Sequence, residues 1–357
     1  MKRNIAHLPL HTGRAPAWLF AKMKILARLL IEAIIEEYGT KTFIERLSDP
    51  YWFQSFGCVL GFDWHSSGLT TTTLGAIKEA LRDIGRDYGI FAAGGKGRTS
   101  RSTPEQLMTI AEKTGLNPEP LIYTSKIVAK VDSAAYQDNY DIYAHTLIFD
   151  KSGNWSVVQQ GMNNKNRMAR RYHWFSDKIE KFTIDPHAGV IAPKKEQLIL
   201  NMTDKKTVAA QSTVTELSKE NPDNLFKELK LIREKEMSLP RRHQILLSDI
   251  NPERIHKILL KTYDSTPKDF EKLLMTKGVG AKTIRALSLI SDIVYGAAPS
   301  YSEPEIYTFA HGGKDGTPFP VDRHLYDKSI EIMRAAVRKS KIGERDKLNA
   351  LKNLQNF

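Results

Sequence analysis

The sequence contains a single cysteine, Cys58, among its 357 residues. One cysteine excludes an internal disulfide, a four-cysteine cluster and a cysteine-rich zinc module, so a metal ion would need histidine or carboxylate ligands. No stretch is apolar over the length needed to cross a bilayer, and the first residues, MKRNIAHLPLHTG, lack the apolar core of a signal peptide. We therefore expect a cytoplasmic protein with no membrane partner.

Acidic residues are too few to balance the basic ones. Lys and Arg number 53 against 41 Asp and Glu, which gives a formal net charge of +12. Such an excess favours polyanionic partners, because each neutralised phosphate releases condensed counterions. The charge does not choose between DNA and RNA, and the alternative is a mildly basic protein that binds no nucleic acid. The sequence does not indicate an oligomeric state.

Periodicity predicts an α+β protein that is mostly α. Residues 1–120 are expected to form a helical N-terminal region, in which Ser102 or Thr103 caps a helix that ends at Gly115. Residues 121–190 are expected to form a small antiparallel sheet, because IYTSKIVAKVD, YDIYAHTLIFD and WSVVQQGM are rich in β-branched and aromatic residues. Residues 191–357 return to helical spacing.

The stretch MTKGVGAKTI, residues 275–284, joins two helical runs through Gly278, Val279 and Gly280. Helix, glycine–apolar–glycine turn and helix form the helix-hairpin-helix pattern. Its glycines let the backbone approach a phosphate, and the second helix offers free amides at its positive end. Lys282 and Arg285 add charge there, and the contact would read the DNA backbone rather than its bases. The alternative is a plain helical hairpin whose glycines serve packing.

GVGAKTIRALSLI together with the later PVDRH resembles the helix-hairpin-helix DNA glycosylase superfamily, over about residues 240–335. The resemblance implies that Lys282 attacks the deoxyribose carbon to form a Schiff base. It also implies that Asp322 stabilises the positive charge that develops on the sugar. The sequence departs from the pattern at Thr276 and Lys277, where an apolar residue and proline are usual, and in the longer separation of Lys282 from Asp322. Asp322 also suits a helix-capping position.

Other stretches carry a second resemblance, which extends over nearly the whole chain. It is to an uncharacterised archaeal and bacterial family known as domain of unknown function 763, and it implies one intact protein without implying an activity. The stretches that carry it are LPLHTGRAPAWL, DPYWFQSFGCVLGFDWHSSGLTTTTLGA, GGKG, VVQQGMN, RMARRYHW, GVGAKT and AHGGKDG.

Several further residues are candidates for DNA binding. The loop after GGKG could wrap a phosphate or remain a solvated loop, and the segment NNKNRMARRYHWF could place basic residues on phosphates and aromatic rings on bases. The latter segment could equally turn its aromatic residues into the core. AHGGKDG lies directly upstream of Asp322. The candidates from these stretches are Lys96, Arg98, Arg101, Arg167, Arg170, Arg171, Trp174, His311 and Lys314.

A metal-dependent alternative rests on acidic residues. Asp63 and His65 could share a Mg²⁺ or Mn²⁺ ion, although two ligands alone are also typical of a structural polar pair. The expected sheet carries Asp132, Asp138 and Asp141 near Lys130, as in nuclease sites that activate water on a metal ion. The sequence thus predicts a DNA-processing enzyme of the glycosylase or lyase type, with a metal-dependent nuclease and a non-catalytic DNA-structure-binding protein as alternatives.

Overall fold

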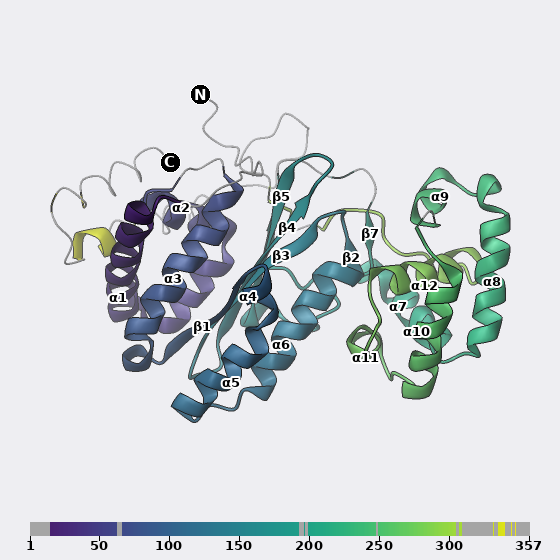
Figure 1. Ribbon diagram of the computed structural model, residues 1–357, viewed down its shortest axis with the longest axis horizontal. Helices are drawn as coiled ribbons and strands as arrows, with labels where there is room; N and C mark the ends of the chain where they lie inside the picture. The colour runs from purple at the N-terminus through teal and green to yellow at the C-terminus, as the bar shows by residue number, and fades with distance from the viewer. Residues whose placement is uncertain are drawn as a thin grey trace.

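A computed structural model gives the three-dimensional structure. It describes residues 15–62, 66–192, 196, 199–247, 249–304, 307–308, 331, 335–339, 344 and 347. The fold is α+β and mostly α, as the sequence predicts. A twisted sheet lies near the middle of the molecule, with helices on both of its faces and a further group of helices at one end (Figure 1).

The main sheet has the strand order β1-β3-β4-β5-β6-β8. Neighbouring strands from β1 to β6 pair antiparallel, and β8 runs parallel to β6. A separate two-stranded sheet pairs β2 with β7. The strands are β1 (Ile90–Lys96), β2 (Tyr136–Gln137), β3 (Asp141–Asp150), β4 (Trp155–Asn163), β5 (Met168–Phe175), β6 (Gly189–Ile191), β7 (Leu200–Asn201) and β8 (Tyr307–Thr308).

Three N-terminal helices pack on one face of the sheet (Figure 1). Asp49 caps the second of them by accepting hydrogen bonds from the amides of Tyr51 and Trp52, and Gly89 ends the third in the left-handed conformation. Their apolar sides form one core with the sheet residues Ile148 and Val158. These helices are α1 (Ala17–Ser48), α2 (Pro50–Val59) and α3 (Ser67–Tyr88).

The opposite face is covered by α4 (Arg98–Arg101), α5 (Thr103–Thr114), α6 (Glu119–Lys130) and the π-helix η1 (Val131–Ala135). The expectation of a strand at IYTSKIVAKVD was wrong, because this stretch forms α6 and the start of η1. Its β-branched residues suggest a strand, but Pro120 occupies the first turn of a helix and buried side chains recur every three residues at Ile122, Ser125 and Val128.

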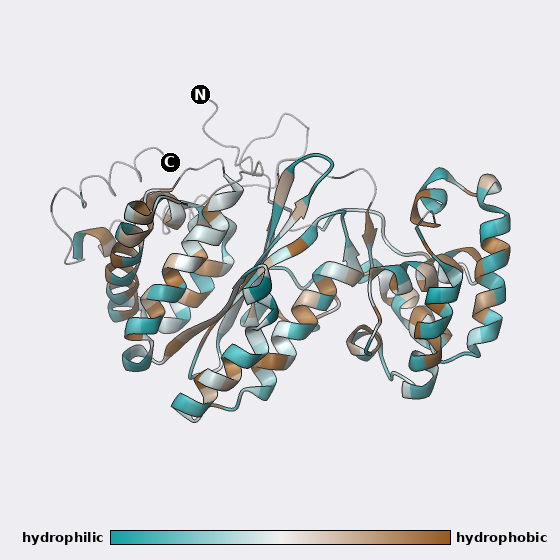
Figure 2. Ribbon diagram, viewed as in Figure 1, coloured by the Kyte–Doolittle hydropathy of each residue, from teal (hydrophilic) through white to brown (hydrophobic). Residues whose placement is uncertain are grey.

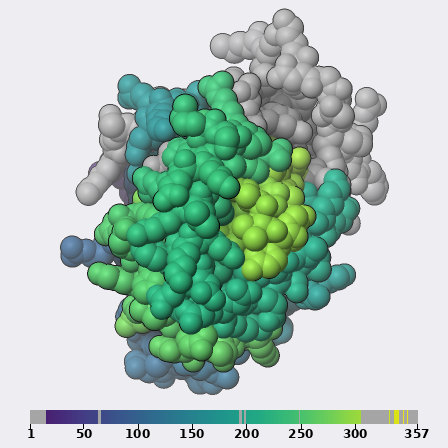
Figure 3. Space-filling view, turned by 90° about the vertical axis from the view of Figure 1, so that its right-hand side faces the viewer, coloured from purple at the N-terminus to yellow at the C-terminus, as the bar shows by residue number. Residues whose placement is uncertain are grey.

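The end of the molecule beyond the sheet is helical, and these helices fill most of that face in the space-filling view (Figure 3). In Figure 2 these helices carry both hydrophobic (brown) and hydrophilic (teal) residues. Their hydrophobic residues belong to the same core as those of α6 and η1. The elements are η3 (Lys205–Thr207), α7 (Val208–Leu217), α8 (Pro222–Glu234), η4 (Glu236–Ser238), α9 (Arg241–Leu247), α10 (Pro252–Ser265), α11 (Phe270–Met275) and α12 (Ala281–Ile293), while η2 (Ser176–Lys178) follows β5.

The expected N-terminal and middle regions share one sheet. Strand β1 lies within residues 1–120, which were expected to be helical, and pairs along its whole length with β3. Helices α1 to α3 cover the sheet to which β1 belongs. The two regions therefore form one packed unit, to which α7–α12 attach through α6 and η1.

Candidate nucleic-acid interface

The predicted hairpin joins α11 to α12. The amide of Val279 donates to the carbonyl of Thr276, and Gly278 has a φ of 97°, a value that favours glycine. The Val279 side chain is 1% exposed and anchors the turn in the core between the helices. Lys277 and Gly278 are exposed. The turn thus has its apolar residue inside and Gly278 at the surface, while Gly280 is half-buried.

The first amides at the start of α12 make no hydrogen bond to the described residues. Thr283 and Ile284 donate to the carbonyl of Gly280, but the amides of Gly280, Ala281 and Lys282 have no hydrogen-bond partner among the described residues. A Cβ added at Gly280 would meet nothing within 4 Å. The positive end of a 13-residue helix therefore has three amides without a partner among the described residues, and the space beside Gly280 is open.

Two cations flank this helix end, and both contact Asp249. The ammonium nitrogen of Lys282 lies 3.2 Å from Asp249 Oδ2 and 3.0 Å from the Asp249 carbonyl oxygen, and its side chain is 54% exposed. Arg285 pairs with Asp249 Oδ1 and also donates twice to Gln137 Oε1. Lys282 is therefore available at the surface, whereas Arg285 mainly ties α12 to its neighbours.

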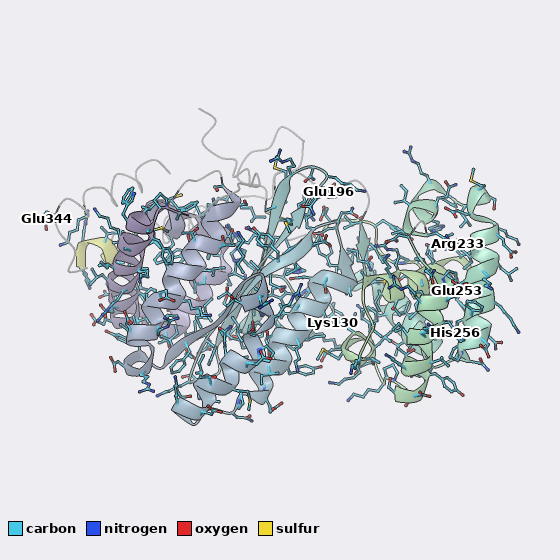
Figure 4. All side chains as sticks on the ribbon, viewed as in Figure 1. Lys130, Glu196, Arg233, Glu253, His256 and Glu344 are labelled. Carbon is cyan, nitrogen blue, oxygen red and sulfur yellow. The ribbon has the colours of Figure 1, made fainter. Side chains whose placement is uncertain are left out.

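Lys130 supports the turn from behind. It is the last residue of α6, lies between the sheet and the end helices (Figure 4), and donates from Nζ to the carbonyl oxygen of Val279. Burial lowers the pKa of this half-buried lysine. The sequence suggested Lys130 as a neighbour of the sheet acids, but the structure places it at the hairpin, where it adds positive charge beneath the turn.

A second turn, between α9 and α10, repeats these features. The amide of Ile250 donates to the carbonyl of Leu247, the Ile250 side chain is buried, and Arg233 donates to the Ile250 carbonyl. Asn251 is the N-cap residue of α10, and Gly280 occupies the equivalent position before α12. The repeat was not predicted from the sequence. Its signal there is the similarity of INPERI, residues 250–255, to VGAKTI, residues 279–284. The two copies differ in charge, since Glu253 occupies the first turn of α10 and Lys282 that of α12.

Three of the predicted DNA-binding residues lie in the core instead. Arg170, Arg171 and Trp174 belong to β5 and are each 0% exposed, so the prediction that they contact DNA was wrong. The physical reason is that β5 lies between β4 and β6 in a sheet covered by helices on both faces. By contrast, Lys96, Arg98, Arg101 and Arg167 are exposed.

The two buried arginines are held by polar side chains. Arg170 pairs with Asp138 at 2.9 Å and with Glu303 at 3.0 Å. Arg171 donates to Gln54, Thr70, His173 and the Pro50 carbonyl, and burial lowers its pKa to about 9.

The sheet acids do not converge on an open metal site. Asp132 accepts hydrogen bonds from Gln159 and Trp174 and pairs with His187, and it is 1% exposed. Within the described part of the chain, no group of three His, Cys, Asp or Glu residues is placed to hold a metal ion. The remaining predicted site residues, Asp63, His65, His311, Lys314 and Asp322, lie outside the described residues.

Comparison with known proteins places the chain in a family. A family model described as a protein of unknown function, DUF763, matches residues 4–321. The chain belongs to this family. No curated protein and no solved structure matched the chain. The resemblance of its C-terminal part to helix-hairpin-helix glycosylases therefore rests on the motif. None of the described helices is long and apolar enough to cross a membrane.

Proposed function

We propose that this DUF763 member is a DNA-binding protein that holds the phosphodiester backbone of duplex DNA at the α11–α12 hairpin. One observation carries the proposal, namely the turn at the exposed Gly278, after which the amides of Gly280, Ala281 and Lys282 have no partner among the described residues. A phosphate oxygen accepts hydrogen bonds from such amides and is favoured by the helix dipole.

The surrounding charge supports the same partner. Lys277 and Lys282 are exposed on either side of the turn, and Lys130 lies half-buried behind it. The chain as a whole has a formal net charge of +12. Contacts of this kind fix position on the backbone and carry no base information, so binding would depend strongly on salt and weakly on sequence.

Whether Lys282 also takes part in catalysis at the hairpin is a separate question. A Schiff-base mechanism needs a lysine that loses its proton readily, usually because it is desolvated. Lys282 is half exposed and bonded to Asp249, which suits a phosphate-binding cation better than a nucleophile. If the protein is a lyase, borohydride should reduce its Schiff base with abasic DNA and leave a stable covalent adduct. Loss of that adduct in Lys282→Ala would establish the mechanism. A metal-dependent nuclease would instead cut undamaged DNA only with Mg²⁺ or Mn²⁺.

The binding proposal is tested by fluorescence anisotropy with a labelled duplex of about 20 base pairs over a range of salt concentrations. The double variant Lys277→Gln, Lys282→Gln should bind more weakly, with a salt slope smaller by about two. A control with the same charge change, Arg28→Gln, Lys41→Gln, removes two cations that are paired with acids elsewhere and should bind like the wild type. Equal slopes for both variants would refute the hairpin as the contact, and competition with a matched RNA duplex tests the preference for DNA.

A further inference from the structure

Five exposed basic residues lie at one end of the main sheet, well removed along the chain from the hairpin. Lys96 is the last residue of β1, and Arg98 and Arg101 belong to α4, which follows it. Lys165 and Arg167 belong to the turn between β4 and β5. None of the five has a carboxylate partner among the described residues, whereas Lys282 and Arg285 both contact Asp249. We call these five residues the sheet-end surface.

The sheet register places the two parts of this surface at the same end. Lys96 pairs with Ala144, and Ala144 pairs on its other side with Gln160 of β4. Lys96 is therefore two strand spacings, about 10 Å, from Gln160. Lys165 comes five residues after Gln160. The two parts are thus separated by roughly 20 Å, which about six base pairs of a duplex would span.

The chain holds the loop of Lys96 in place with several contacts. Gly94 has a φ of 106°, and a Cβ there would lie 2.2 Å from the His145 carbonyl oxygen, so only glycine fits. Lys78 of α3 donates to the Gly94 carbonyl at 2.6 Å, and the Gly94 amide donates to Gln106 of α5 at 3.0 Å.

The side chains of Lys78 and Gln106 also form a hydrogen bond with each other, and Gln106 reaches the backbone of Thr99. Lys78 donates to Gln106 Oε1 at 2.6 Å, and Gln106 donates to the Thr99 carbonyl at 3.1 Å. Lys78 is itself half-buried, and burial lowers its pKa. A cationic loop is thus fixed by a lysine and a glutamine from two different helices.

The other part is ordered in a similar way. Asn163 accepts hydrogen bonds from the amides of Lys165 and Asn166, and Asn166 accepts one from the amide of Met168. Arg167 has a φ of 56°. Both parts therefore present cations that lack a carboxylate partner in the described part of the chain, from a backbone fixed in advance, which lowers the entropy lost when a partner binds.

We propose that the sheet-end surface is a second contact for the phosphodiester backbone of DNA. Its cations lie on an open surface and extend over a distance that suits successive phosphates of a polymer better than one small anion. The proposal shares only the partner with the hairpin and uses none of its residues. A duplex that reaches both surfaces would gain affinity from the second contact without any new base recognition.

The test uses the full chain and a labelled duplex of about 30 base pairs, with the salt slope as the readout. The triple variant Lys96→Gln, Arg98→Gln, Arg101→Gln should lower affinity about tenfold or more at low salt and reduce the slope by two to three. The matched control Arg28→Gln, Lys41→Gln, Arg82→Gln removes three cations that are paired with acids and should change the slope by less than about 0.5. Thermal melting of each variant checks that the fold is intact.

The outcomes separate this inference from the proposed function. A triple variant that binds like the wild type, while Lys277→Gln, Lys282→Gln weakens binding, overturns the sheet-end surface and leaves the hairpin standing. A triple variant that weakens binding, while the hairpin variant does not, supports the sheet-end surface and overturns the hairpin. A wild-type protein that binds matched RNA and no DNA, or neither nucleic acid, overturns both.

Discussion

The carboxylate of Asp249 lies 3.2 Å from the ammonium nitrogen of Lys282, although the acid precedes α10 and the lysine lies in the first turn of α12. Asp249 also pairs with Arg285. An acidic group from one turn of the repeated pair thus contacts the cations of the other, beside the helix end where a phosphate would bind. Lys282 and Arg285 cannot bind both the Asp249 carboxylate and a DNA phosphate with full strength.

We therefore predict that Asp249→Asn strengthens DNA binding. Exposed ion pairs contribute about 0.2–1 kcal/mol, so the dissociation constant should fall by up to about fivefold at low salt. Fluorescence anisotropy measures the change, and Asp264→Asn, at an exposed position on α10, controls for the altered net charge. Weaker binding by Asp249→Asn would mean that the acid positions Lys282 for DNA instead of competing with it.

Gly278 and Gly280 should respond differently to alanine. Gly278 has a φ of 97°, and a Cβ there would lie 2.9 Å from Ile258 Cδ1, so Gly278→Ala should destabilise the protein by about 1–2 kcal/mol. Gly280 has extended backbone and open space, so Gly280→Ala should change the free energy of unfolding by less than about 0.5 kcal/mol. Urea unfolding distinguishes the two. Equal effects would contradict the turn geometry.

The hairpin and the strands β3 and β4 could be predicted because their signals are local. The signals are the glycines around Val279 and the β-branched and aromatic residues of YDIYAHTLIFD and WSVVQQGM, which depend on a few neighbouring residues. Strand β1 was missed because Ile90–Lys96 has little alternation and forms only by pairing with β3, far along the chain. Helix α6 was misread because its β-branched residues suggest a strand while its burial follows a helical period.

The site was less predictable than the fold because charge does not reveal its partner. Arg170 is a buried residue whose acids, Asp138 and Glu303, come from distant parts of the chain. Lys96 is an exposed residue without such an acid among the described residues. Both occur in basic stretches, and only the tertiary packing separates a core cation from a surface one.

Arg170 should matter for stability rather than for DNA binding. Removing one partner from a buried ion pair leaves the other charge uncompensated and typically costs about 3–5 kcal/mol. Arg170→Gln should therefore destabilise the protein by roughly that amount, because Asp138 and Glu303 would lose their shared cation. Urea unfolding measures the loss. A variant of wild-type stability that bound DNA weakly would restore the prediction of a surface role.

Asp138 should make stability depend on pH. Burial raises the pKa of its carboxyl to about 6. Arg170 and Tyr172 oppose this rise because they favour the ionised form. Because the folded pKa exceeds the unfolded one, the stabilising contribution is complete below about pH 4 and is lost as the pH rises through about 6. The wild type should thus lose stability relative to Asp138→Asn between these values, by at most about 1.4 kcal/mol per pH unit. Urea unfolding at several pH values checks this, and a constant difference would contradict it.

The hairpin as the DNA contact is tested most directly by DNA binding of Gly280→Ala. The added methyl group meets no atom of the protein within 4 Å, so the fold should remain, but it would occupy the space through which a phosphate approaches the free amides of α12. We predict a loss of affinity of about tenfold for duplex DNA, which corresponds to about 1.4 kcal/mol, with an unchanged melting temperature. Wild-type affinity in this variant would contradict the proposed contact.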